Sequence, residues 1–379
     1  MVKQEPFGVE QFMDKYETSI KYNMGETCVD SLKMNEIIPE SEQADVAKTL
    51  LDTKLVYGHI RGSPELKSQI SALYDDSITP ENVVVTNGAI GANFLLFYSL
   101  VEKGDHVLVV EPSYQQLSSV PKMFGGNVDT FKILLEDSYL PNLASLEESI
   151  KTNKTRLLVI NNPNNPTGFV WDNEIMEKIV GICQSYNVTL MCDEVYRPLY
   201  HEANGTKSVV SFGYENTIST GSMSKAFSLA GLRLGWIVTK DAALIESIYE
   251  KRDYNTISVS MVDDLLATIA LKHKDNILER GHAICKNNLD VLEEAITKSN
   301  GLLQWQRPRG GSTCFVKINA EVNTLAMAEE LATKHGVLLV PGELFNQSGS
   351  VRIGFGNGER DIKEGIKVLI SWLADRSGR

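Results

Sequence analysis

The sequence lacks paired cysteines, long apolar runs and any excess of basic residues. Its five cysteines are scattered, with none of the close spacings that zinc sites or redox dithiols use, so we expect buried, reduced thiols and no metal site. No apolar run approaches the roughly 20 residues that cross a bilayer, and the opening stretch MVKQEPFGVEQF has no apolar core of a secretory signal. We therefore expect a cytoplasmic protein without a membrane partner.

The formal net charge is −12 and no run of lysine and arginine could follow a phosphate backbone, which argues against a nucleic-acid partner.

What the sequence does contain is a series of short runs that are apolar throughout. Strands buried on both faces have this pattern, and the segments between several runs show helical spacing. The chain is therefore predicted to be of the α/β class, with a mostly parallel sheet covered by helices. The runs are residues 82–85, 106–110, 156–160, 188–192 and 234–238.

At 379 residues the chain is long enough for two domains. Its last hundred residues mix a long polar helical pattern with the strand-like segments CFVKI and VRIGF, which indicates a smaller α+β domain. We predict a large α/β domain over residues 41–285 and a small α+β domain made of residues 1–40 and 286–379.

Polar and glycine-rich segments follow the apolar runs, at the edge where open α/β sheets build their sites. In VVVTNGAIGANFLLF a strand leads through a glycine turn into a helix, so Gly88, Ala89 and Ile90 are candidates to cradle a phosphate with helix N-terminal amides. A single glycine turn is weak evidence, and by itself it favours an ordinary connection.

Two further segments could orient a flat ligand. Tyr114 in EPSYQQ lies immediately beyond a buried run, where its ring could stack on a planar group or simply pack. Asn165 lies in VINNPNNPTGFVW, whose two Asn-Pro steps predict a rigid loop that holds one amide orientation. The alternative for this loop is a plain turn.

Asp193 and Lys225 carry the chemistry in the last two segments. In LMCDEVYRPLY, Asp193 ends a buried strand, and a buried carboxylate calls for a cationic nitrogen, although a capping role is the competing interpretation. In GSMSKAF, Lys225 sits among small residues, where confinement should favour the neutral amine that attacks a carbonyl to form an imine. A solvent-facing loop lysine is the alternative.

Arg233 follows Lys225 by eight residues and is a permanent cation suited to a phosphate, with Ser222 and Ser224 as hydroxyl donors. A phosphate cradle, a stacking ring, an oriented amide, a buried carboxylate and an imine-forming amine together match the needs of pyridoxal 5'-phosphate. We therefore predict this cofactor.

The sequence resembles the class I/II aminotransferases of the fold-type-I pyridoxal phosphate enzymes over nearly its whole length. The matching segments are NNPNNPTG, DEVY, SMSK with an arginine eight positions later, and VRIGFG. A fainter similarity links QFMDKYETSIKYNMGETCVDSL to the capreomycidine synthase-like branch, whose enzymes cyclise a modified arginine.

The resemblance implies roles for individual residues. Lys225 would form the Schiff base with the cofactor and Asp193 would pair with its ring nitrogen, while Asn165 and Tyr196 bond its phenolic oxygen and Tyr114 stacks on the ring. Lys225, Asp193 and Tyr196 are the predicted catalytic residues. The phosphate would be held by the amides of Ala89 and Ile90, by Ser222 and Arg233, and by Tyr57, while Gly88 and Ser224 stay cofactor-binding candidates from the sequence itself.

Tyr57 of VYGHIRGSPELK would reach its phosphate across the interface of a homodimer with shared active sites. Arg352 of VRIGFG matches the arginine that grips the substrate α-carboxylate, with Asn165 and Gly25 beside it. The chain departs from many relatives in having His59 and Arg61 where apolar residues or proline are usual, and in lacking a serine or threonine in TNGAIGA.

These residues predict an aminotransferase that acts on an α-amino acid and a keto acid, with Lys225 as the base that removes the Cα proton. A lyase or cyclase using the same cofactor is the first alternative, because its cofactor residues would look alike. A non-catalytic domain of a transcription regulator is a remote alternative, disfavoured by the acidic charge and by the lack of a preceding DNA-binding module. The substrate side chain is not identified, although Glu26, Asp30, His59 and Arg61 are polar candidates that could equally be solvated surface residues.

Overall fold

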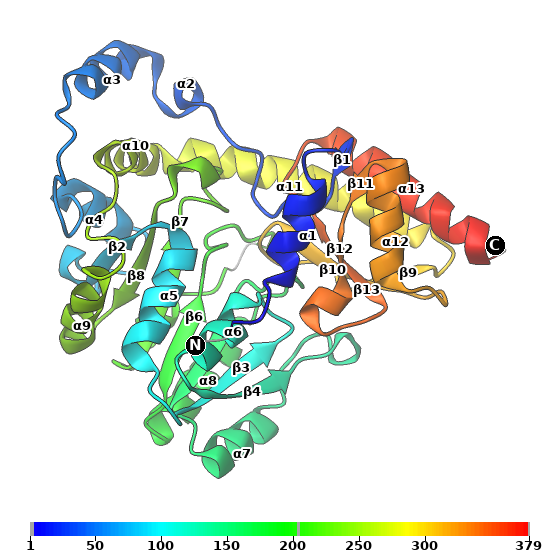
Figure 1. Ribbon diagram of the computed structural model, residues 1–379, viewed down its shortest axis with the longest axis horizontal. Coiled ribbons are helices and arrows are strands. Elements are labelled where there is room, and N and C mark those ends of the chain that lie inside the picture. The colour runs from blue at the N-terminus through cyan, green and yellow to red at the C-terminus, as the bar shows by residue number, and fades with distance from the viewer. Residues whose placement is uncertain (1–3, 203–204, 378–379) are drawn as a thin grey trace.

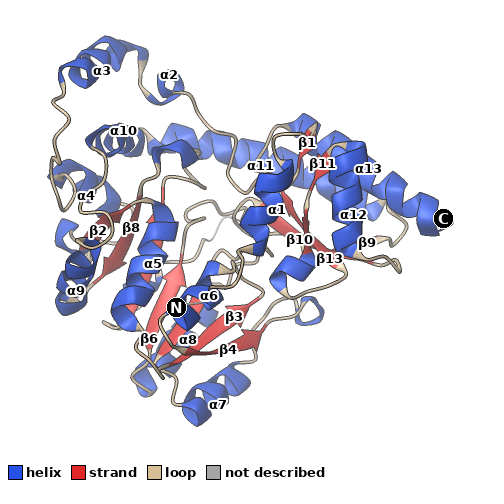
Figure 2. Ribbon diagram, in the orientation of Figure 1, coloured by secondary structure: helices blue, strands red, loops and turns tan. Residues whose placement is uncertain are grey.

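The computed structural model describes residues 4–202 and 205–377. Its largest element is a seven-stranded sheet in the order β2-β8-β7-β6-β5-β3-β4 (Figure 2). All neighbouring strands pair in parallel except at β8, which is antiparallel to both β2 and β7. The predicted α/β fold with a mostly parallel sheet is confirmed. The strands are β2 (Val83–Thr86), β3 (His106–Glu111), β4 (Asn127–Lys132), β5 (Leu157–Asn161), β6 (Thr189–Asp193), β7 (Thr217–Ser222) and β8 (Gly235–Thr239).

The inner strands of this sheet are buried on both faces because helices cover each side (Figure 1). Alternate residues of a strand point to opposite faces, so Val84 and Val159 pack against α5, α6 and α9, whereas Val85 and Leu158 lie in the cluster that includes α4, α7, α8 and α10. The helices are α4 (Pro64–Ser71), α5 (Gly88–Leu100), α6 (Gln116–Met123), α7 (Leu143–Asn153), α8 (Asn173–Ser185), α9 (Ala242–Arg252) and α10 (Met261–Lys272).

Local sequence explains where these helices begin. Asp172 caps α8 by accepting a hydrogen bond from the Ile175 amide at 3.0 Å, and the buried face of α8 repeats at helical spacing as predicted. Ser63 caps α4 in the same way, with Pro64 at the first helical position. Short 3-10 segments lie at Pro80–Asn82, Leu135–Asp137, Val209–Ser211, Ala230–Leu232 and Gly342–Phe345, and a π-helical turn at Leu331–His335.

A second, smaller group of strands and helices combines the two ends of the chain. An antiparallel sheet in the order β12-β13-β10-β9 lies beside the parallel pair β1–β11, and α1 from the N-terminal segment contacts β12 (Figure 1). The elements are β1 (Tyr22–Asn23), β9 (Leu303–Trp305), β10 (Thr313–Ile318), β11 (Val337–Leu338), β12 (Val340–Pro341), β13 (Ser350–Gly354), α1 (Gly8–Tyr16), α11 (Lys274–Thr297), α12 (Thr324–Glu330) and α13 (Glu359–Ser377).

The two-domain division stays a prediction. Its boundary at residue 285 falls inside α11, which is a continuous helix from Lys274 to Thr297. The other boundary, at residue 40, falls where α3 (Glu40–Asp52) begins, after the short α2 (Met34–Ile37). No residue of α3 is buried, and Figure 1 shows this helix standing away from the large sheet. Within the described ranges, no helix combines the length and apolarity that a membrane crossing requires.

Candidate active site

A cavity of about 360 Å³ lies where the large sheet meets the smaller group of elements. Its floor is formed at the carboxyl ends of β5, β6 and β7, and its opposite wall by α1, β13 and the segment after β1. Predicted site residues from segments far apart in the sequence meet here, namely Gly25, Ala89, Ile90, Tyr114, Asn165, Asp193, Tyr196, Ser222, Ser224, Lys225, Arg233 and Arg352.

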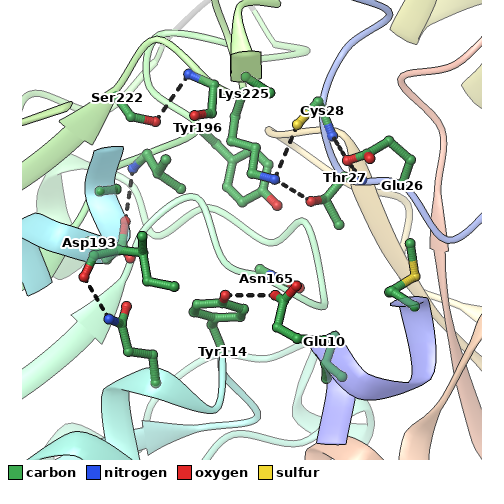
Figure 3. A pocket seen from close by; sticks show the side chains of 18 of the residues that line it. Glu10, Glu26, Thr27, Cys28, Tyr114, Asn165, Asp193, Tyr196, Ser222 and Lys225 are labelled. Atoms are coloured by element: carbon green, nitrogen blue, oxygen red, sulfur yellow. Dashed lines mark hydrogen bonds between the residues drawn. The ribbon is translucent and has the colours of Figure 1, made fainter. Parts of the chain in front are cut away.

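Lys225 follows β7 by three residues and points across the cavity (Figure 3). Its Nζ donates a hydrogen bond to Thr27 Oγ1 at 2.5 Å and lies 3.3 Å from Cys28 Sγ. Burial by itself would lower the pKa of this amine, yet its contacts with Cys28, Tyr196 and Glu26 raise that pKa above the usual range. In the ligand-free state these neighbours therefore oppose the expected neutral amine.

Glu26 is the carboxylate that faces this ammonium. It accepts hydrogen bonds from the backbone amides of Thr27 at 2.6 Å and Cys28 at 2.8 Å (Figure 3). Burial opposes ionisation of Glu26, but the charge of Lys225 and the two amides lower its pKa below the usual value. The cavity thus contains a carboxylate whose charge acts on the lysine, although no hydrogen bond or ion pair joins Glu26 to Lys225.

Asp193 ends β6 and is buried. Its Oδ2 accepts a hydrogen bond from Asn93 Nδ2 at 3.0 Å, and its Oδ1 accepts one from the Val195 amide at 3.1 Å. Burial raises the pKa of Asp193, while these two donors oppose that rise. A buried carboxylate with no cation among its hydrogen-bond partners is suited to receive a cationic ligand nitrogen.

Two tyrosines line the cavity from different sides. Tyr196 is fully buried, and its hydroxyl has no hydrogen-bond partner within the described residues, so a polar acceptor or donor is missing there. Tyr114 donates its hydroxyl hydrogen to Glu10 Oε1 at 2.8 Å, which ties the ring to α1 (Figure 3). Asn165 presents its side-chain oxygen to Arg352, at 3.4 Å from Nη1.

The opposite end of the cavity collects donors suited to a phosphate. α5 begins at Gly88, and the side chain of the preceding Asn87 makes no capping bond, so no side-chain cap takes up the first-turn amides of this helix. A Cβ at Gly88 would lie 2.9 Å from Arg233 Nη2, and its φ of +71° also favours glycine. Arg233 Nη1 in turn donates to the carbonyl of Ala230 at 2.9 Å.

Arg352 lies in β13 and is only 2% exposed. Its Nη2 donates to the carbonyl oxygen of Gly25 at 2.8 Å, whereas its Nε has no partner among the described residues. Burial lowers the pKa of this guanidinium, and nearby acidic groups that include Glu10 and Glu26 oppose the shift. A buried cation with spare donors at the cavity wall is suited to a ligand carboxylate.

Comparison with known proteins identifies the family of this chain. Residues 20–369 match the family described as Aminotransferase class I and II. The chain belongs to the class I and II aminotransferases. The predictions of this family, of an enzyme and of pyridoxal phosphate as cofactor are confirmed.

Several relatives are similar over most of their length. A PLP-dependent aminotransferase from Streptococcus suis, known from its crystal structure, is 37% identical with a TM-score of 0.94 and covers 100% of this chain and 99% of its own. Capreomycidine synthase of Streptomyces vinaceus is 30% identical over 76% of this chain and 73% of that enzyme. Aspartate aminotransferase of Sulfurisphaera tokodaii is 32% identical over 87% of this chain and 85% of that enzyme.

The cavity fits the family's cofactor in two respects. Because Gly88 has no Cβ, the Arg233 guanidinium can lie against the start of α5, so a guanidinium and helix N-terminal amides stand together at one end of the cavity. The orphaned hydroxyl of buried Tyr196 and the buried carboxylate of Asp193 supply hydrogen-bonding groups for the two sides of a pyridine ring. The residues present therefore match a phosphorylated, ring-shaped ligand.

Several predicted residues lie outside this cavity. Gly88 stands behind its wall against Arg233, and Tyr57 is 64% exposed, so its role across an interface stays a prediction. Arg61 pairs with Glu246 at 2.7 Å, and neither it nor His59 lines the cavity.

Asp30 pairs with Arg280 at 2.5 Å, which leaves Glu26 as the one cavity-lining residue among the four polar candidates. The sequence did not point to the lining residues Glu10, Glu17, Thr27, Cys28, Asn93 and Gln116. Most of them lie in segments that the sequence singled out, but only tertiary packing shows which side chains of those segments enter the cavity.

Proposed function

We propose that the protein is a pyridoxal phosphate-dependent aminotransferase that moves an amino group between an α-amino acid and a keto acid. The observation that carries this proposal is the meeting of Lys225, Asp193 and Arg352 in one cavity. Their three functions are covalent attachment, charge balance at a ring nitrogen and capture of a carboxylate. All three are required for chemistry at the Cα of an amino acid.

In this proposal each end of the cavity holds one part of the cofactor. Asp193 balances the ring nitrogen, with Asn165 and Tyr196 at the phenolic oxygen and Tyr114 against the ring. The phosphate is held by Ala89, Ile90, Ser222, Ser224 and Arg233. When bound, pyridoxal phosphate accepts the electron pair released as the substrate's Cα–H bond breaks.

Lys225 moves the proton in this reaction. With substrate bound, its free amine would take the Cα proton as general base and would then deliver a proton to the cofactor's aldehyde carbon, so that hydrolysis could release a keto acid. In the ligand-free state its Nζ donates to Thr27 Oγ1 and lies 3.3 Å from Cys28 Sγ. The substrate α-carboxylate binds Arg352, which fixes the Cα within reach of that amine.

The charges of the cavity restrict the substrate side chain. Its cationic lining residues are Lys225, Arg233 and Arg352 within the described ranges, and the proposal uses all three. The other charged side chains that line the cavity are Asp193, which the proposal uses, and Glu10, Glu17 and Glu26. Among the residues of one chain, a second substrate carboxylate would meet like charge and no further cation, so we propose a donor with a neutral or basic side chain.

Product analysis tests this function. The purified protein is incubated with single amino acids, with and without 2-oxoglutarate or pyruvate, and the products are identified by mass. Keto acid formed only when an acceptor is present supports transamination. Two results together would contradict the proposed charge preference. Aspartate would be the best donor, and Glu10→Gln would not raise the rate of keto acid formation from aspartate.

A lyase or cyclase is the second candidate, because capreomycidine synthase is among the similar proteins. The same incubations separate the two candidates. A donor consumed in the absence of any acceptor, with ammonia release or with a cyclic product that has lost a leaving group, would support the lyase or cyclase and contradict the aminotransferase.

We also propose that the protein works as a homodimer in the cytoplasm. The segment from α3 to residue 60 exposes a run of apolar side chains, namely Leu51, Leu55, Val56, Tyr57 and Ile60, and α3 buries none of its residues within one chain. A second copy would cover this surface and place Tyr57 at the neighbouring phosphate end. The five cysteines are buried and unpaired, which suits a reducing compartment.

A further inference from the structure

Asn93 is a buried polar residue of the cavity wall that has no role in the chemistry described above. It lies in α5, three residues beyond Ile90, and is 1% exposed. Residues three apart in a helix lie on the same face. The first turn of α5 thus presents its amides to the phosphate end of the cavity, and Asn93, one turn further on, faces Asp193.

The hydrogen bonds of Asn93 fix the orientation of its amide. Its Nδ2 donates to Asp193 Oδ2 at 3.0 Å and to Gln116 Oε1 at 3.2 Å, while its Oδ1 accepts from Thr220 Oγ1 at 2.9 Å. The reversed amide would place its oxygen against a carboxylate oxygen and a second amide oxygen, which are all acceptors. The orientation is therefore determined by the partners.

Gln116 extends this contact toward the phosphate end. Its Nε2 donates to the carbonyl oxygen of Ile90 at 2.7 Å. A continuous chain of hydrogen bonds thus runs from Ile90 through Gln116 and Asn93 to Asp193. Both amide side chains in this chain are neutral at every physiological pH.

We infer that Asn93 is a positioning residue, which holds the Asp193 carboxylate toward the cofactor ring nitrogen and links it through Gln116 to the phosphate-binding turn. The inference rests on the proposed function, in which Asp193 balances that nitrogen. Asp193 is buried, with one donor on each carboxylate oxygen. Removing the Asn93 donor leaves Oδ2 without a described partner, and a buried carboxylate that loses a donor takes up a proton more readily.

Two variants test the inference. Asn93→Leu has a similar volume and no donor, and Asn93→Asp places a second carboxylate beside Asp193. We expect the affinity for pyridoxal phosphate at pH 7 to fall about ten- to a hundredfold in Asn93→Leu, because a hydrogen bond to a charged group is lost. We expect a larger fall in Asn93→Asp, because two adjacent carboxylates cannot both stay ionised.

The pH dependence separates positioning from a general loss of structure. In both variants the loss of cofactor affinity on acidification should begin at a higher pH than in the unmodified protein. The matched control is Asn288→Leu, since Asn288 is equally buried but bonds the carbonyls of Phe355 and Asn357 and does not line the cavity. This control should lose stability without moving the pH profile. An Asn93→Leu profile that coincides with the unmodified one would overturn the inference.

A second measurement distinguishes failure of this inference from failure of the proposed function. The titration of Asp193 is followed by carboxyl carbon NMR in the full chain without added cofactor, with Asp193→Asn to assign the signal. The midpoint should rise in Asn93→Leu, and an unchanged midpoint would refute the role of Asn93. If the unmodified protein does not bind pyridoxal phosphate at all, the proposed function fails, and the NMR result still decides whether Asn93 controls Asp193.

Discussion

Arg352 offers the sharpest prediction about substrate recognition. Its guanidinium has five N–H donors, of which one contacts Gly25 at 2.8 Å and one approaches Asn165 at 3.4 Å. The Nε hydrogen and the remaining Nη hydrogens have no described partner. A substrate α-carboxylate can therefore accept two charge-assisted hydrogen bonds from this one buried side chain.

The expected magnitude follows from these two bonds. A hydrogen bond to a charged group contributes about 1.5–3 kcal/mol, so Arg352→Ala should cost about 3–6 kcal/mol of transition-state binding. Because about 1.4 kcal/mol corresponds to a factor of ten, kcat/KM should fall about 10²- to 10⁴-fold. Arg352→Lys keeps the charge but loses the fork geometry, and we expect an intermediate loss.

The assay compares an amino acid with the amine that lacks its carboxylate. If Arg352 binds the carboxylate, Arg352→Lys should lower kcat/KM for the amino acid and leave the slow reaction of the amine nearly unchanged. Arg61→Gln is the control, because Arg61 pairs with Glu246 outside the cavity. An equal loss with both substrates would refute the assignment and indicate a general disturbance of the cavity.

Two further predictions concern the shared site and stability. Tyr57→Phe should weaken cofactor affinity. Mixing Tyr57→Phe subunits with Lys225→Ala subunits should restore activity, because each mixed dimer contains one site with both Tyr57 and Lys225 intact. If activity is not restored, Tyr57 belongs to the site of its own subunit. Burial lowers the pKa of His201 to about 4, so the unfolded chain takes up a proton first as the pH falls below about 6.5. The free energy of unfolding should therefore decrease between about pH 6.5 and 4, by at most about 3 kcal/mol from this residue, and urea titrations of His201→Gln should show a smaller decrease.

The apolar strands of the large sheet could be predicted because nearly all their own residues are apolar, which is typical of strands buried on both faces. Every residue of β5 is buried, and Val159 and Ile160 belong to a run that is apolar over its length. β7 could not be predicted in this way, since its sequence TISTGS is mostly hydroxyl groups and glycine. Ser219 and Thr220 can be buried there only because Glu194 and Asn93 accept their hydroxyl hydrogens.

Some residues of the candidate site could likewise be proposed from the sequence, and others could not. Lys225 and Asp193 could be proposed from the sequence because each stands out against its small or apolar neighbours. Glu10 could not, since it reaches Tyr114 from a helix 104 residues away. The raised pKa of Lys225 was also beyond the sequence, because Thr27 and Cys28 approach its Nζ from the other side of the cavity.

The central claim is that the amine of Lys225 carries the cofactor. The most direct test is to reduce the protein with borohydride in the presence of pyridoxal phosphate and to map the modified peptide by mass spectrometry. We expect a yellow chromophore that disappears on reduction and one phosphopyridoxyl group, attached to Lys225 and absent from Lys225→Ala. A label on another lysine, or an unlabelled and colourless protein, would contradict it.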